Sequence, residues 1–367
     1  MSSIERRGES TVTGQERVES RRKSRRRATT RALRCAVPGV VAASTVLGMV
    51  GIAGAAPARV EGRLKKVPHV AFFGFATDNS FAQATWKGVQ KAAKKFGGTA
   101  FFFNGNFSAT TQIAQMEDAI TSGKYNVFVV QANDGSSVVP EVRAAIKKGI
   151  VVVAEFTQVG SNYAAIKPQV KGEISVVEDS VLNGTDLGKL GIGACGSLPK
   201  CNVVYLQGFP TLPLTVARTK AALAELKSDP KVDVLETPKG GYTASTGETV
   251  TEDVLSAHPT VNVIIGSSQA IEGATIVLRD HHLLGKVKLV GNGGSVTAVT
   301  YVRKGDWYAT FGIPEVTDGY EATLFGIEKL EGGKPPTATN SATLGPNKGL
   351  WTQPVVRKLH LEGQYRD

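Results

Sequence analysis

Strand-like apolar runs alternate with helix-like segments along this 367-residue chain, and this alternation constrains the fold more than any other feature. The first unit shows the pattern clearly. Val70 to Phe75 is a short, nearly continuous apolar run, as expected for a parallel strand covered on both faces. Thr77 to Ser80 are polar and suited to capping a helix, and apolar residues then recur at helical spacing, with lysines between them, up to Phe96.

The strand–loop–helix unit repeats, lapses between Tyr163 and Lys171, and then restarts. We predict strands at Val70–Phe75, Thr99–Phe103, Tyr125–Val130, Ile150–Glu155, Gly172–Val177, Asn202–Leu206, Val232–Glu236, Val261–Ile265, Val287–Val290 and Tyr308–Phe311. We predict helices from Phe81 to Phe96 and at Thr110–Thr121, Val138–Lys148, Leu182–Ala194, Leu214–Lys227, Glu248–Ala257, Ile271–Arg279, Thr297–Lys304 and Asp318–Leu330, followed by a Gly/Pro/Thr-rich tail. Two such series predict an α/β fold with two doubly wound parallel-sheet lobes that face each other across a ligand cleft.

The loops that follow the predicted strands are the expected site of function. In an open parallel sheet, ligands bind just beyond the carboxyl ends of the strands. The loop from Thr77 to Phe81 occupies that place in the first unit. We therefore expect further loops of the same kind to meet at one cleft.

The N-terminal segment has the order of a secretory signal. An arginine-dense stretch at residues 21–31 precedes an apolar run from Ala36 to Ala53, which ends in Ala56-Pro57-Ala58. We predict a secretion signal at residues 1–58, cleavage near Ala58 and an extracytoplasmic location in the periplasm or cell-wall space. The alternative is a basic arm followed by a membrane anchor. Most of the net charge of +11 lies in this segment, so the folded part is nearly balanced and does not indicate a nucleic-acid partner.

Two cysteines, Cys195 and Cys201, remain after the predicted signal, separated by the turn-like segment Gly-Ser-Leu-Pro-Lys. An exported chain can keep a disulfide, so a small loop closed by a bridge is the favoured interpretation. The alternative is two independent thiols.

Motifs for catalysis, cofactors and metals are missing or misplaced in the sequence. There is no CxxC pair, HExxH, P-loop or GxSxG motif. Gly191-x-Gly193-x-x-Gly196 matches a dinucleotide-binding fingerprint but stands where a predicted helix ends, whereas the fingerprint works only between a strand and the start of a helix. We predict no enzyme activity, no cofactor and no metal.

The chain from about Val67 to Gly332 resembles the periplasmic ribose/galactose-type sugar-binding proteins, which are the solute receptors of ABC importers. The segments that carry the resemblance are VAFFGFATDNSFAQATWKGVQKAAKK, AQMEDAITSGKYNVFVVQANDGSSVVPEVRAAIKKGIVVV, VVYLQGFP, SAHPTVNVIIG and KLVGNGGS, in this order and spacing. The resemblance implies two lobes joined by three hinge segments that close on one ligand. It places the N-terminal lobe at 59–178 and 314–336, the C-terminal lobe at 179–313, and the tail with the last crossover at 337–367.

The resemblance also implies a set of ligand-binding residues. In the first loop, Asp78, Asn79 and Phe81 fall on positions that grip the sugar and stack on it. The alternative is that Asp78 and Asn79 only cap the helix and Phe81 belongs to the core. The remaining matched positions, or residues adjacent to them, are Glu155, Phe156, Arg218, Tyr242, Ser267, Ser268, Gln269 and Asn292.

Several polar positions of a pentose site are replaced in this chain. Phe156-Thr157 stands where the family often has Asp-Arg, and Gly293 where it usually has Asp. A site that hydrogen-bonds hydroxyls discriminates through those groups, so a ligand with fewer hydroxyls is the alternative to a sugar.

The implied function is capture of a sugar or sugar-like solute by a monomeric protein that delivers it to an ABC permease. A sensory receptor that uses the same fold is the other alternative.

Overall fold

The computed structural model describes residues 64–366 of the chain. The predicted secretion signal and its cleavage site near Ala58 lie outside the described residues. Among the helices between residues 64 and 366, none combines the length and the apolar character needed to cross a membrane.

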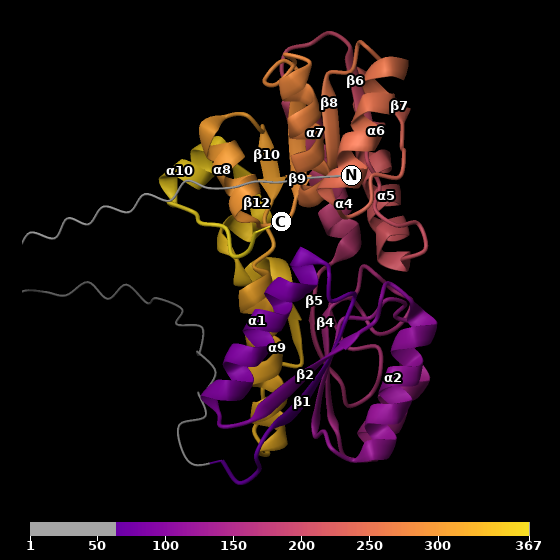
Figure 1. The fold of residues 1–367 in the computed structure, drawn as a ribbon, viewed down its shortest axis with the longest axis vertical. Helices are drawn as coiled ribbons and strands as arrows, with labels where there is room; N and C mark the ends of the chain where they lie inside the picture. Colours follow the sequence, from indigo (N-terminus) through magenta and orange to yellow (C-terminus); the bar gives the residue numbers. More distant parts are fainter. Residues whose placement is uncertain (1–63, 367) are drawn as a thin grey trace, which may run out of the picture. The chain divides into compact units, whose positions relative to one another are not determined.

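The first lobe is built on a sheet of six parallel strands within the described residues, in the order β11-β5-β4-β3-β1-β2 (Figure 1). Its strands are β1 (His69–Gly74), β2 (Thr99–Asn104), β3 (Val127–Val130), β4 (Val151–Phe156), β5 (Ile174–Val177) and β11 (Ala338–Asn340). Helices α1 (Ser80–Lys95) and α9 (Glu315–Leu330) cover one face, and α2 (Ala109–Ser122) and α3 (Val139–Lys147) cover the other.

The second lobe has a sheet in the order β12-β10-β9-β8-β6-β7, in which only β12 is antiparallel among the described strands. Its strands are β6 (Cys201–Tyr205), β7 (Val232–Glu236), β8 (Val263–Ser267), β9 (Lys288–Asn292), β10 (Ala309–Phe311) and β12 (Leu350–Thr352). Helices α4 (Ser180–Cys195) and α5 (Pro213–Leu226) cover one face; α6 (Ala244–Ala257), α7 (Ser268–Asp280), α8 (Val296–Lys304) and α10 (Gln353–Lys358) contribute to the opposite core.

Strand β1 shows why its sequence is a continuous apolar run. Val70 and Phe72 pack in the core beneath α1 and α9, whereas Ala71 and Phe73 pack in the core beneath α2 and α3. All four side chains are fully buried because successive residues of a strand point to opposite faces of the sheet and helices cover both faces. The predicted fold class, two doubly wound parallel-sheet lobes, is confirmed.

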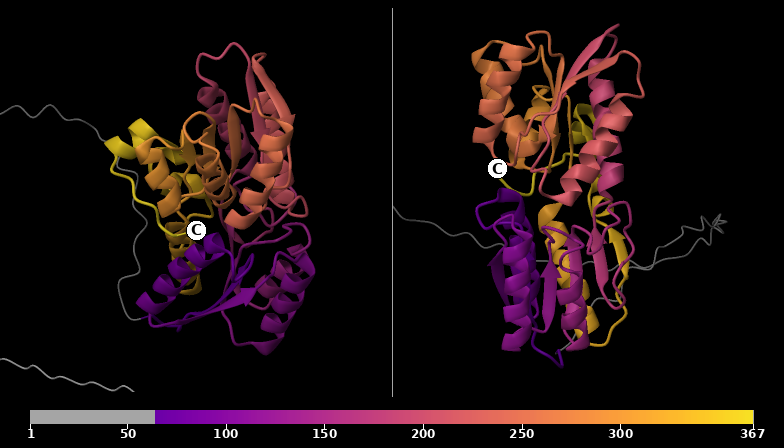
Figure 2. Two further views of the ribbon diagram at one scale, coloured as in Figure 1. Left: turned by 45° about the horizontal axis from the view of Figure 1, so that its top comes forward. Right: turned by 90° about the vertical axis from the view of Figure 1, so that its right-hand side faces the viewer.

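The chain crosses between the lobes three times within residues 64–366. The first crossing leads from β5 to α4, and the second from β10 through Gly312–Pro314 to α9. The third leads from β11 through two short 3₁₀ helices, η1 (Ser341–Leu344) and η2 (Pro346–Gly349), to β12. The views in Figure 2 show that each lobe keeps its own sheet and helices on either side of these connections.

The C-terminal part of the chain holds more structure than the predicted tail. β11 joins the edge of the first sheet, and β12 pairs antiparallel with β10. Both strands have three residues and no distinctive apolar run, so they form through pairing with a sheet that already exists. α6 starts four residues before its predicted first residue, because the Thr243 side chain accepts a hydrogen bond from the Thr246 amide and caps the helix there.

The disulfide favoured from the sequence is present. Cys195, the last residue of α4, is bonded to Cys201, the first residue of β6, and both are buried. The bridge therefore closes the tight connection between these two elements.

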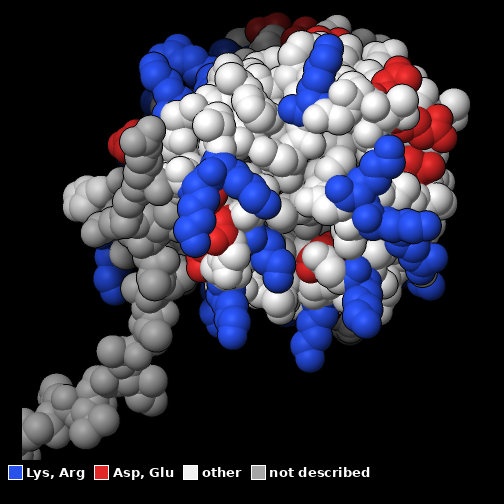
Figure 3. All heavy atoms as spheres, turned by 90° about the horizontal axis from the view of Figure 1, so that it is seen from below, with Lys and Arg blue, Asp and Glu red and all other residues white. Residues whose placement is uncertain are grey.

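Lysine and arginine side chains gather on the face of the first lobe that lies away from the second lobe (Figure 3). Lys94, Lys95, Lys147 and Lys329 all lie in the last turns of their helices. A positive charge at a helix C-terminus interacts favourably with the helix dipole. Lysines at these four positions therefore have a structural reason that does not require a nucleic-acid partner.

Candidate functional site

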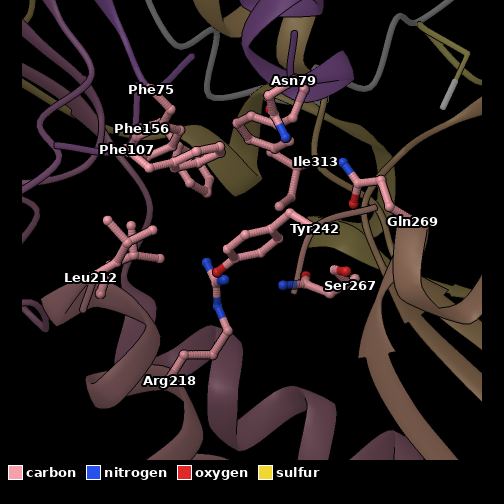
Figure 4. Close-up of a pocket in the computed structure, with 13 residues that line it drawn as sticks. Phe75, Asn79, Phe107, Phe156, Leu212, Arg218, Tyr242, Ser267, Gln269 and Ile313 are labelled. Carbon is pink, nitrogen blue, oxygen red and sulfur yellow. The ribbon is translucent and has the colours of Figure 1, made fainter. Parts of the chain in front are cut away.

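A pocket lies between the two lobes, at the carboxyl ends of their strands (Figure 4). Side chains of both lobes line it, together with Ile313 of the second crossing. The volume of this cavity is about 40 Å³, which is close to the space that one water molecule needs. The side chains that line the pocket therefore nearly fill it. The lining residues are Phe75, Asn79, Phe81, Phe107, Phe156, Leu212, Leu214, Arg218, Tyr242, Ser267, Gln269, Asn292 and Ile313.

Aromatic rings from the two lobes meet across this pocket. The Phe107 ring, from the loop after β2, is 5.0 Å from the Phe209 ring and 6.2 Å from the Tyr242 ring, between ring centroids. On the first lobe, the Phe81 and Phe156 rings are 4.6 Å apart. Closure of the lobes in this structure therefore rests partly on contacts between aromatic side chains.

Phe156 has a left-handed backbone conformation, with a φ of 56°. This conformation is costly for a bulky residue and persists only where the surroundings enforce it. Here β4 ends, and the Phe156 ring packs between the rings of Phe75 and Phe81, with the Arg218 guanidinium 6.0 Å from its centroid. The strained residue thus directs its ring into the lining of the pocket.

Arg218 is the charged residue of the described lining, and it is paired. Its guanidinium Nη2 lies 2.5 Å from Oε2 of Glu178, which stands at the first crossing between the lobes. Both side chains are buried. Burial acts to lower the pKa of Arg218, but Glu178 together with the neighbouring Tyr242 and Tyr205 raises the pKa overall, so the guanidinium stays charged. Its Nε atom is buried without a hydrogen-bond partner among the described residues.

Gly184 of α4 allows Arg218 to take this position. A Cβ atom at residue 184 would collide with the Arg218 backbone carbonyl, so the glycine lets α4 and α5 approach closely. This close approach of the two helices brings Arg218 of α5 next to Glu178 at the first crossing.

Several polar side chains of the pocket are engaged in hydrogen bonds with other protein groups. Ser267 Oγ accepts from the Ala270 amide, which caps α7, and donates to the Gly241 carbonyl. Asn292 and Asn183 exchange hydrogen bonds between their amides, at 3.1 and 3.4 Å. Gln269 Nε2 donates to Ser80 Oγ at 3.2 Å, which links the second lobe to the first.

Asn79 combines the two roles considered for it from the sequence. Its Oδ1 accepts a hydrogen bond of 2.9 Å from the Ala82 amide and caps α1, and the residue also lines the pocket. Of the proposed ligand-binding residues, the lining includes Asn79, Phe81, Phe156, Arg218, Tyr242, Ser267, Gln269 and Asn292.

Three of the proposed residues do not line this pocket. Asp78 is exposed at the start of the first loop. Ser268 is fully buried, within 3.3 Å of the Tyr365 hydroxyl.

Glu155 is also fully buried, and its carboxylate accepts hydrogen bonds from Gln131 and Thr85 inside the first lobe. It does not reach the cleft because its side chain points into the lobe, while the next residue, Phe156, turns toward the pocket.

Glu155 belongs to a buried acidic cluster near the second crossing. Burial raises its pKa to about 8, although hydrogen bonds from Asp318 and Gln131 oppose the rise. Burial also raises the pKa of Asp318, as does the neighbouring Glu155. The two carboxyl groups therefore hold a proton in the neutral pH range.

Sequence reasoning missed four apolar lining residues, Phe75, Phe107, Leu212 and Leu214. Phe75 follows β1 directly and Phe107 lies three residues after the end of β2, so their places beyond the carboxyl ends of strands could have indicated them. Leu212 and Leu214 flank the first residue of α5 and carry no comparable signal.

Residues 70–334 match the family described as periplasmic binding protein domain. The chain belongs to this family. The family is one of binding proteins, so the prediction that the chain is not an enzyme is confirmed. Among curated relatives, the ribose import binding protein of Bacillus subtilis (strain 168) is 25% identical over 263 residues, which cover 70% of this chain and 80% of that protein.

Solved structures of solute-binding proteins share the fold. An ABC transporter periplasmic solute binding protein from Actinobacillus succinogenes 130z with bound D-allose has a TM-score of 0.68 and 19% identity, covering 79% of this chain and 99% of that one. An ABC transporter solute binding protein from Mycobacterium smegmatis with bound glycerol has a TM-score of 0.69 and 22% identity, covering 82% and 100%. These similarities show the two-lobe fold, and the chemistry of the pocket has to be derived from this chain's own residues.

Proposed function

We propose that this periplasmic binding protein is an exported receptor that captures a sugar or sugar-like small molecule by closing its lobes and delivers it to an ABC importer. The observation that carries the proposal is the pocket lined by both lobes at the carboxyl ends of their strands. A ligand that contacts both lobes stabilises the closed arrangement relative to the open one, which is the basis of capture by closure.

The related proteins support the transport role. The Bacillus relative is named for ribose import, and solved proteins of the same fold hold D-allose, D-arabinose or D-fucose. Export is supported by the secretory order of residues 1–58 and by the periplasmic family. The ABC permease partner and the monomeric state are parts of the same proposal.

Asn79, Arg218 and Gln269 are proposed as polar ligand contacts, and Phe81, Phe156 and Tyr242 as the rings that pack on the ligand body. Asn79 and Phe81 act from the first lobe and Arg218, Tyr242 and Gln269 from the second. Ser267 and Asn292 are proposed as neighbours that hold the pocket wall in place through their hydrogen bonds.

Thermal unfolding of the full chain against pentoses, hexoses, polyols and cyclic non-sugars tests the proposal. A solute at about a hundred times its dissociation constant adds about 2.7 kcal/mol to the free energy of unfolding, so the melting temperature should rise by several degrees. Asn79→Ser keeps a capping side chain for α1 but removes the amide from the pocket, so it should weaken the response. Ser108→Thr, at the cap of α2 outside the pocket lining, is the matched control and should respond like the unchanged chain. Absence of a saturable response to every solute would refute the proposed function.

A further inference from the structure

We propose that the solute is an uncharged ring with a mainly apolar body, one or two hydrogen-bond acceptors and few hydroxyl groups, which enters when the lobes are further apart than in this closed arrangement. The inference rests on the proposed function, because it concerns the ligand of the same pocket. It follows from the character of the lining, the pairing of its charge and the hydrogen bonds in which its polar groups already take part.

The lining is mainly apolar on both lobes. Eight of its thirteen side chains are aromatic or aliphatic. A sugar presents an apolar ring face but also a rim of hydroxyl groups. Burying these hydroxyls against apolar side chains is unfavourable, because they lose hydrogen bonds to water and gain none from the protein. Phe107 on one lobe and Tyr242 on the other lie nearly parallel, with 13° between their ring planes. The two rings pack on each other at 6.2 Å in this closed arrangement, so each lobe presents an apolar surface to the cleft.

The charge pairing favours an uncharged solute. Arg218 is held by Glu178, and both groups are buried. An anion that drew the guanidinium away would leave a buried carboxylate without its partner, which is strongly unfavourable. A cation would find no aspartate or glutamate among the thirteen lining residues. The lining therefore offers no free opposite charge to an anionic or a cationic solute.

The hydrogen-bonding groups favour acceptors over hydroxyls on the solute. The buried Nε of Arg218 is a donor without a partner among the described residues. The Asn79 amide oxygen is occupied by the cap of α1, which leaves its amide nitrogen as a second donor, on the opposite lobe. The side-chain oxygens of Ser267 and Asn292 already accept hydrogen bonds from protein groups.

A carbonyl or ether oxygen needs only a donor, which Arg218 Nε supplies. Each hydroxyl of a sugar also donates a hydrogen bond and so needs an acceptor, and the engaged oxygens of this lining offer few. A site of this kind rejects a polyhydroxylated ring because several of its buried hydroxyl protons would stay unpaired.

A set of six-membered carbocycles of similar size tests the inference by calorimetric titration of the full chain. Cyclohexanone carries one acceptor and no donor, myo-inositol is fully hydroxylated, cyclohexanecarboxylate is an anion and cyclohexylammonium is a cation. The expected result is that cyclohexanone binds at least tenfold more tightly than each of the other three.

A pair of variants locates the binding. Phe107→Asn removes the ring, and asparagine tolerates the φ of 52° found at this position. It should weaken the binding of cyclohexanone at least tenfold. Phe101→Asn removes an exposed ring of the first lobe that does not line the pocket, and it should leave the affinity within twofold.

The outcomes separate this inference from the proposed function. Tighter binding of myo-inositol, of either ion, or of a pentose or hexose overturns the inference, while solute capture stands. No effect of Phe107→Asn on cyclohexanone binding overturns it as well, because the ring would then bind elsewhere. Failure of all four carbocycles overturns the inference, and the proposed function fails with it only if the broader solute panel also gives no saturable response.

Discussion

The Glu178–Arg218 pair gives a quantitative test of the buried cleft. The Glu178 side chain is 2% exposed and the Arg218 side chain 8%, so this is a buried ion pair. Surface ion pairs, by contrast, typically contribute only about 0–1 kcal/mol to the free energy of unfolding. Glu178→Ala removes the carboxylate and leaves the guanidinium buried and uncompensated. We expect the free energy of unfolding to fall by about 3–5 kcal/mol.

The double variant Glu178→Leu with Arg218→Met separates the unpaired charge from the loss of contacts. Replacing both partners of a buried pair with apolar residues is often neutral or stabilising, by about 1–4 kcal/mol, because no charge then remains to be solvated. The double variant should therefore be clearly more stable than Glu178→Ala.

Urea unfolding, followed both by fluorescence and by circular dichroism, measures these differences and shows whether the two probes report one transition. Asp233→Ala is the control, because Asp233 pairs with Lys200 at 49% and 71% exposure and should cost no more than about 1 kcal/mol. A loss below about 1 kcal/mol for Glu178→Ala, or equal losses for the single and double variants, would refute the description of a buried, charged pair.

Three further predictions concern stability. Replacing Cys195 and Cys201 by serine should lower the free energy of unfolding by about 2 kcal/mol, since the bridge closes a short loop; reduction by dithiothreitol in the unchanged chain should give a similar loss. The pKa of Glu155 is raised to about 8 in the folded chain, so its contribution to stability is present below about pH 4.5 and is lost as the pH rises through 8. Unfolding measured from pH 5 to 8.5 should show this fall, and Glu155→Gln should flatten it; an unchanged slope would contradict the burial of that carboxyl. Gln364→Ala should cost about 1 kcal/mol, because the Gln364 side chain accepts hydrogen bonds from two amides at the start of α9, and Glu362→Ala, at an exposed site nearby, should cost less than half of that.

The long alternation in the sequence was sufficient to predict the sheets and their helices. Runs such as Val70–Phe75 are apolar throughout because both faces of the strand are covered, and this requirement can be read locally. β11 and β12 could not be found in this way. With three residues each, they depend on pairing with β5 and β10, which are distant in sequence.

The candidate site was predictable in outline and not in detail. Loops after strands converge on one cleft whatever their sequence, so Asn79, Tyr242 and Gln269 could be placed near it. The sequence could not predict that Phe156, and not Glu155, faces the pocket at the end of β4, since this depends on the left-handed backbone of Phe156. The pairing of Arg218 with Glu178 could not be predicted either, because the two residues are 40 positions apart in the sequence and no motif marks the crossing that carries Glu178.

The return of the chain to the first lobe has a consequence for its synthesis. α9 and β11 complete that lobe, but they follow the whole of β6 to β10 in the sequence. At about 5–20 residues per second, on the order of 10–30 s separate the completion of β5 from that of α9 on the ribosome. During that interval, the face of the first sheet around Phe72 and Val129 lacks the helix that contributes Phe325 to its core. The nascent first lobe therefore exposes apolar surface of the kind that chaperones bind until most of the second lobe has been made.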